Sequence, residues 1–223
     1  MSMTASAPRV TLGSWPTALE PAPRLAAALG LNGDDLWIKR EDLGGLGGGG
    51  NKLRKLEFSV GAALADGADT LVTIGGAQSN HARLTAAVGV RLGLRVVLVF
   101  PGRYDGVRGG NVALEGLFGA QVHWAGDVDF VELAEVAAGI TEQLRADGAR
   151  PVLLGLGGTS AVASLGYLEA GRELLGQLPK LHTAVVALGS GGTMAGLVAA
   201  LGPERVFGVD VGALNDPAGV VAG

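Results

Sequence analysis

The chain has 223 residues, of which 48% are hydrophobic, and carries a formal net charge of −4 with a pI near 5.4. It can therefore bury a substantial core in one large or two small domains, and it offers no basic field for a nucleic acid backbone. Without cysteine it forms no disulfide, and no apolar run approaches the roughly 18 residues of a membrane span, so we expect a cytoplasmic protein with no membrane or nucleic acid partner.

Short β-rich runs alternate with longer amphipathic or alanine-rich stretches, which is typical of an α/β fold with parallel sheets flanked by helices. In chain order, the pattern predicts strands at 36–39, 70–74, 95–100, 121–124, 151–154, 183–188 and 205–211, and helices at 53–66, 80–92, 111–118, 129–146, 161–178 and 194–201. The runs 70–74 and 183–188 are apolar without alternation, which predicts strands covered on both faces.

A glycine run after the first predicted strand leads into Asn51 and Lys52. Taken alone, a lysine beside glycines is more often a solvated surface residue. Lys52 is nevertheless one of only four lysines, and an amine can form a Schiff base with an aldehyde cofactor. Leu53 follows it where a Walker loop needs Ser or Thr, and no acidic residue ends the next strand as a nicotinamide site requires. Lys52 is therefore a candidate for covalent chemistry.

The loop after the strand at 70–74 brings polar side chains to the start of a helix. Ser79, Asn80 and His81 lie there, and Ser79 or Asn80 could equally be a helix cap. His81 is one of three histidines, which lack the cysteine partners or H-x-x-x-H spacing of a metal site, so we expect no metal. A helix start at the carboxyl end of a strand is a place where anionic ligands bind.

The loop after the strand at 183–188 reads Gly-Ser-Gly-Gly-Thr at 189–193. Its glycines allow backbone N–H groups to converge on an anion, and Ser190 and Thr193 add hydroxyl donors at a positive helix end. A tight turn without a ligand would use the same residues. Together with Lys52, the loop indicates a ligand with both an aldehyde and a phosphate, as in pyridoxal 5′-phosphate.

These motifs, in this order, resemble the fold-type II pyridoxal phosphate enzymes, which are tryptophan synthase β-like, and within them the D-cysteine desulfhydrase and 1-aminocyclopropane-1-carboxylate deaminase group. The resemblance is carried by Trp37-Ile38-Lys39-Arg40-Glu41-Asp42, Gly50-Asn51-Lys52-Leu53-Arg54-Lys55-Leu56-Glu57, Gln78-Ser79-Asn80-His81, Gly166-Tyr167 and the glycine loop that ends at Gly196.

The resemblance implies two domains with the cofactor between them, in a homodimer. The larger domain would comprise 1–51 and 159–223, and the smaller inserted domain 52–158. Because members of the group are longer, the larger domain is expected to be incomplete and to lack the partner of the pyridine nitrogen and a tyrosine near the substrate.

The resemblance also implies a role for each candidate residue. Lys52 would hold the cofactor and then move protons on the substrate, and Asn80 would hydrogen-bond the pyridoxal 3′-oxygen. The substrate would lie on Ser79, Asn80 and His81, with Ser79 also catalytic. The phosphate would be held by Ser190, Gly191, Gly192 and Thr193. We assign no catalytic role to Arg54, Lys55 or Glu57.

The implied activity is a lyase reaction, the β-elimination of D-cysteine or a similar small D-amino acid to pyruvate, ammonia and sulfide. Histidine at position 81 favours this reaction over deamination of 1-aminocyclopropane-1-carboxylate to 2-oxobutyrate and ammonia. A sulfo-lyase that acts on cysteate is a relative with similar motifs. A non-catalytic remnant that only binds pyridoxal phosphate is the alternative from another class.

Overall fold

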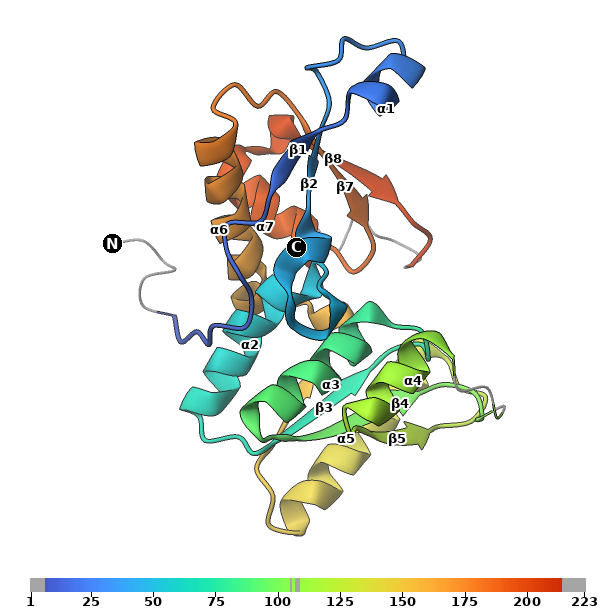
Figure 1. Ribbon diagram of the computed structural model, residues 1–223. Coiled ribbons are helices and arrows are strands. Elements are labelled where there is room, and N and C mark those ends of the chain that lie inside the picture. Colours follow the sequence, from blue (N-terminus) through green and yellow to red (C-terminus); the bar gives the residue numbers. More distant parts are fainter. Residues whose placement is uncertain (1–6, 105, 107–108, 214–223) are drawn as a thin grey trace.

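The computed structural model describes residues 7–104, 106 and 109–213, which form an α/β fold (Figure 1). The helices are α1 (Pro23–Ala28), α2 (Lys52–Ala65), α3 (Asn80–Leu92), α4 (Gly110–Leu117), α5 (Phe130–Ala146), α6 (Ala161–Gln177) and α7 (Gly192–Leu201). The strands are β1 (Leu19–Pro21), β2 (Trp37–Lys39), β3 (Thr70–Ile74), β4 (Arg95–Phe100), β5 (Gln121–Trp124), β6 (Pro151–Leu154), β7 (Ala184–Leu188) and β8 (Val206–Asp210). Four 3-10 turns join them at η1 (Glu41–Gly44), η2 (Leu46–Gly48), η3 (Leu156–Gly158) and η4 (Pro203–Arg205).

One sheet has four parallel strands in the order β5-β4-β3-β6. Leu71 and Leu98 belong to the core that also contains α3 residues, whereas Val72 and Val97 belong to the core on the α5 side. Successive strand residues point to opposite faces, so α3 and α5 cover opposite faces of this sheet. All five residues of β3 are buried, which confirms the prediction that the run 70–74 is covered on both sides.

A second parallel sheet pairs β7 with β8, and α6 and α7 pack against one of its faces. The other face carries Val185, Phe207 and Val209, which are 69%, 62% and 45% exposed. The prediction that the run 183–188 is covered on both faces is therefore wrong. An apolar run shows that the side chains of a strand are hydrophobic. Whether other elements cover them is decided by tertiary packing, which the run itself does not show.

The N-terminal segment was not predicted to contain regular structure before residue 36. It holds β1, which pairs antiparallel with β2, and α1, which begins with proline at N1. Glu57, 1% exposed on α2, anchors the preceding stretch. Its carboxylate accepts hydrogen bonds from Arg9 Nε at 2.9 Å, Leu12 N at 2.8 Å and Trp15 Nε1 at 2.8 Å.

Helix α2 lies between the part of the molecule that contains β7 and β8 and the part that contains the four-stranded sheet (Figure 1). It packs against α6, where a Cβ on Gly166 would lie only 2.2 Å from the carbonyl oxygen of Arg54. The Arg54 guanidinium, 3% exposed, forms ion pairs with Glu41 at 2.7 Å and Glu173 at 2.9 Å. Since α2 also packs against α3, it joins the two parts, and the domain division at residue 52 stays a prediction.

Candidate functional site

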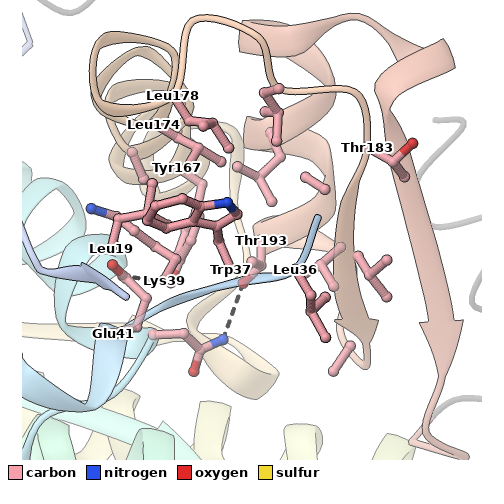
Figure 2. A pocket seen from close by; sticks show the side chains of 18 of the residues that line it. Leu19, Leu36, Trp37, Lys39, Glu41, Tyr167, Leu174, Leu178, Thr183 and Thr193 are labelled. Carbon is pink, nitrogen blue, oxygen red and sulfur yellow. Dashed lines mark hydrogen bonds between the residues drawn. The ribbon is translucent and has the colours of Figure 1, made fainter. Parts of the chain in front are cut away.

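Lys52 is the first residue of α2, directly after the glycine run that the sequence singled out. Its Nζ donates a 3.3 Å hydrogen bond to Asn51 Oδ1. The amide nitrogen of Asn51 donates at 3.1 Å to the hydroxyl of Thr193, a contact marked by the dashed line at Thr193 in Figure 2. Burial lowers the pKa of Lys52 below its ordinary value, and this increases the fraction of neutral, nucleophilic amine.

Lys52 borders a cavity of about 1210 Å³. One wall carries apolar side chains from β1, β2, α6 and β7, among them Leu19, Trp37 and Leu174 (Figure 2). The polar and charged lining residues are Asp34, Asp35, Lys39, Glu41, Asn51, Lys52, Tyr167, Lys180, His182, Thr183, Ser190 and Thr193. A concave, mostly apolar space with a few converging polar groups is the usual form of a small-molecule site.

The glycine loop follows β7 and leads into α7, as predicted from the sequence. Gly191 is the N-cap residue with φ of 81°, a left-handed conformation that a side chain would strain. A Cβ on Gly192 would lie 2.9 Å from Lys55 Nζ, so the backbone of the loop approaches that ammonium closely. Ser190, Gly191 and Thr193 line the same cavity as Lys52.

Lys55 lies one turn after Lys52 and is 1% exposed. Its Nζ donates hydrogen bonds of 2.9 Å to the carbonyl oxygen of Gly157 and 2.9 Å to Thr159 Oγ1. Burial, with a smaller contribution from the charge of Lys52, lowers the pKa of Lys55 to about 7. Thr159 donates in turn to Ser190 Oγ at 2.7 Å, so hydrogen bonds connect the second lysine to the glycine loop.

The predicted cluster 79–81 lies at the start of α3 and does not line this cavity. Ser79 is the N-cap, and its hydroxyl accepts from Ala82 N at 3.2 Å. Asn80 is exposed, and its Oδ1 accepts from Asn111 at 3.2 Å. His81 is 1% exposed, with Nε2 3.0 Å from Thr73 Oγ1.

His81 nevertheless approaches the lysines through the turn η3. A Cβ on Gly158 would lie 2.6 Å from His81 Cε1, and one on Gly157 would lie 3.9 Å from Lys52 Cε. Burial, followed by the charges of Lys55 and Lys52, lowers the pKa of His81 to about 3. The imidazole is therefore neutral near pH 7 and packs behind the η3 turn.

Several residues of this region were not assigned a role from the sequence. The sequence offered a signal for Asn51, which precedes Lys52 in the same motif, and for Tyr167, one of only two tyrosines. Tyr167 donates to Glu41 Oε2 at 3.0 Å. The sequence contained no indication of a role for Thr159, because only the folded chain brings its hydroxyl into contact with Lys55 and Ser190.

The residues present fit pyridoxal phosphate. A partly buried amine and a glycine loop at a helix N-terminus open onto one cavity, and the φ of 81° at Gly191 favours glycine at the position where the loop borders that cavity. In this arrangement Lys52 would offer its amine to the aldehyde, and Ser190, Gly191 and Thr193 would offer donors to the phosphate.

Comparisons with known proteins agree with this geometry. A profile of the family described as "Pyridoxal-phosphate dependent enzyme" matches residues 10–220. A Pyrococcus abyssi protein, provisionally named as a 1-aminocyclopropane-1-carboxylate deaminase, is 42% identical over 219 residues, which cover 95% of this chain and 65% of that protein. A D-cysteine desulfhydrase from Klebsiella pneumoniae is 41% identical over 208 residues, which cover 90% of this chain and 61% of the relative.

Solved structures show the same relationship. The crystal structure of an ACC deaminase homologue aligns with a TM-score of 0.84 at 34% identity, covering 98% of this chain and 71% of the homologue. The threonine deaminase of T.th. aligns with a TM-score of 0.66 at 26% identity, covering 87% of this chain and 59% of that one.

The present chain spans about 60% to 65% of the length of the two curated relatives described above. Among the residues that the structure describes, no helix is both long and apolar enough to span a membrane.

Proposed function

Because this chain belongs to the family of pyridoxal-phosphate-dependent enzymes, we propose that it acts as a lyase or deaminase on a small amino acid, and that Lys52 carries the cofactor. The observation that supports this assignment is that Lys52 and the glycine loop, 137 or more positions apart in the sequence, line one cavity. The family resemblance supports a cytoplasmic homodimer as part of the same proposal.

Pyridoxal phosphate, when bound, supplies an electron sink for the bonds at the substrate Cα. The protein then has to hold the phosphate, orient the substrate and move protons. Ser190, Gly191, Gly192 and Thr193 would hold the phosphate at the positive end of α7. With substrate bound, the neutral amine of Lys52 would accept the Cα proton, and Asn51 would orient that amine through its Oδ1.

We propose D-cysteine as the substrate, which reacts with water to give pyruvate, ammonia and hydrogen sulfide. The second candidate is 1-aminocyclopropane-1-carboxylate, which reacts with water to give 2-oxobutyrate and ammonia. Relatives with both names match at 42% and 41% identity, so both reactions have support. The preference for D-cysteine depended on His81, whose buried ring does not line the cavity, so a substrate panel has to decide.

The experiment is to load the purified protein with pyridoxal phosphate and assay D-cysteine, β-chloro-D-alanine, cysteate and 1-aminocyclopropane-1-carboxylate side by side. Pyruvate and sulfide from D-cysteine would support the desulfhydrase reaction, whereas 2-oxobutyrate would support the deaminase. A yellow protein that turns over none of them would support the non-catalytic alternative. A protein that takes up no pyridoxal phosphate would contradict the proposal.

A further inference from the structure

Two amide side chains tie the start of α3 to the start of α4. Asn111, on α4, donates from Nδ2 to the carbonyl oxygen of Gln78 at 2.7 Å and to Asn80 Oδ1 at 3.2 Å. Gln78 in turn accepts from Asn111 N at 2.8 Å through Oε1 and donates from Nε2 to the carbonyl oxygen of Gly109 at 3.2 Å. These contacts join the loop before α3 to a segment about 30 positions later.

Backbone groups fix which way each amide points. A backbone carbonyl can only accept, so the Asn111 atom that faces Gln78 O has to be its NH₂ group. The same argument at Asn111 N and Gly109 O fixes the amide of Gln78. Because the second hydrogen of Asn111 Nδ2 points to Asn80, the facing atom of Asn80 has to be Oδ1.

The remaining end of Asn80 is therefore its NH₂ group. Within the described part of the chain, the structure gives that nitrogen no protein partner. The start of α3 lies beside the lysine site, since His81 packs on Gly158 and the adjacent Gly157 approaches Lys52 Cε. The Asn80 NH₂ group thus remains as a donor at the start of α3. The family resemblance implies that this residue hydrogen-bonds the 3′-oxygen of the cofactor ring.

We propose that Asn111 is a positioning residue that fixes the Asn80 amide so that its N–H, and not its carbonyl, is left for that oxygen. This inference rests on the proposed function. A carbonyl turned toward an oxygen acceptor would be repelled, whereas an N–H donates to it, and hydrogen bonds to charged groups are stronger than neutral ones. Asn111 thereby selects one of the two amide orientations without touching the cofactor.

Gly110 shows how closely this arrangement is packed. It adopts φ of 58°, and a Cβ there would lie 2.3 Å from Gln78 Oε1. A side chain at 110 would displace the Gln78 amide that holds the backbone N–H of Asn111.

The test is Asn111→Asp, whose carboxylate can only accept and would draw the Asn80 NH₂ toward itself. We expect about 10-fold weaker binding of pyridoxal phosphate to the apoprotein, the size of one lost hydrogen bond to a charged group. The ratio of the long-wavelength to the short-wavelength absorbance band of the loaded protein should also change. Gln121→Glu, an amide-to-acid change at an exposed position of β5, is the matched control and should alter neither quantity.

A double-mutant cycle with Asn80→Ala separates positioning from a general structural effect. If Asn111 acts through Asn80, Asn111→Asp will have no further effect on affinity or on the band ratio in the Asn80→Ala background. Additive effects would overturn the inference, as would an Asn111→Asp protein with the affinity and spectrum of the unmodified chain. If Asn111→Asp does not fold, Asn111→Ala takes its place in the cycle. Failure of the unmodified protein to bind the cofactor would instead contradict the proposed function.

Discussion

Gly157 lies directly against Ser190: a Cβ on Gly157 would come within 2.4 Å of Ser190 Oγ. The turn η3 therefore packs directly against the glycine loop at 189–193. Gly157 has φ of 61° and ψ of 14°, which is a left-handed conformation. Both this conformation and the close contact with Ser190 therefore favour glycine at position 157.

We expect Gly157→Ala to weaken pyridoxal phosphate binding about 10-fold or more, because the added methyl group displaces Ser190 from the loop. Gly93→Ala is a matched control, since Gly93 has φ of 70° and ψ of 27° but open space around its Cβ position. It should lower the free energy of unfolding by about 1 kcal/mol and leave cofactor affinity unchanged. Isothermal titration of the two apoproteins compares them. Equal affinities would show that the Gly157 contact does not position the phosphate loop.

Lys52→Ala should abolish covalent attachment of the cofactor. Reduction of the loaded protein with borohydride fixes a lysine-bound cofactor, so intact mass spectrometry should show the added mass in the unmodified chain and not in the variant. Lys180→Ala, which removes an exposed lysine from the wall of the same cavity, should retain the added mass. Labelling of the Lys52→Ala protein to the same extent would assign the reactive amine elsewhere.

Lys55 should make the stability of the apoprotein depend on pH above neutrality. Its pKa falls from an ordinary 10.5 to about 7 in the folded chain, so between these values the unfolded chain holds more protons than the folded one. The free energy of unfolding should therefore rise with pH in this window, by up to about 1.4 kcal/mol per pH unit for one proton.

The slope of the unfolding free energy against pH is measured by denaturant unfolding at several values between about pH 7.5 and 9.5, near the middle of that window. Lys55→Met should reduce it, although Lys52, whose pKa is also lowered by burial, will leave part of the rise. Lys180→Met, at an exposed position, should leave the slope unchanged. A Lys55→Met protein with an unaltered slope would show that Lys55 is solvated in the folded chain.

Glu57→Gln should lower the free energy of unfolding by about 2–3 kcal/mol, because it removes the charge from a buried acceptor of several hydrogen bonds. The amide NH₂ would also face donors such as Trp15 Nε1. Glu142→Gln, which removes one exposed ion pair with Arg145, should change stability by less than about 0.5 kcal/mol. Chemical denaturation measures both, and similar values for the two variants would contradict the anchoring role of Glu57.

The sequence was sufficient to locate most of the regular structure. The predicted bounds of β3, β4, β5, β6 and α3 agree with the structure, and the other predicted elements differ by one or two residues at one or both ends. Helix and strand periodicity is local, and the glycines and prolines that interrupt it are local as well. The elements β1 and α1, of three and six residues, were not predicted, because neither segment carries a clear apolar period in the sequence.

The sequence by itself also determined that Lys52 and the loop 189–193 are unusual, since a scarce amine and a glycine-rich helix start are visible in one dimension. Only the tertiary structure decided which residues share the site. Thr159 reaches Ser190 and Asn111 reaches Asn80 because helices and turns distant in sequence pack together, and His81 is buried because it faces Thr73 on the neighbouring strand. The uncovered face of β7 was decided in the same way, since burial depends on the neighbours that long-range packing brings to a strand.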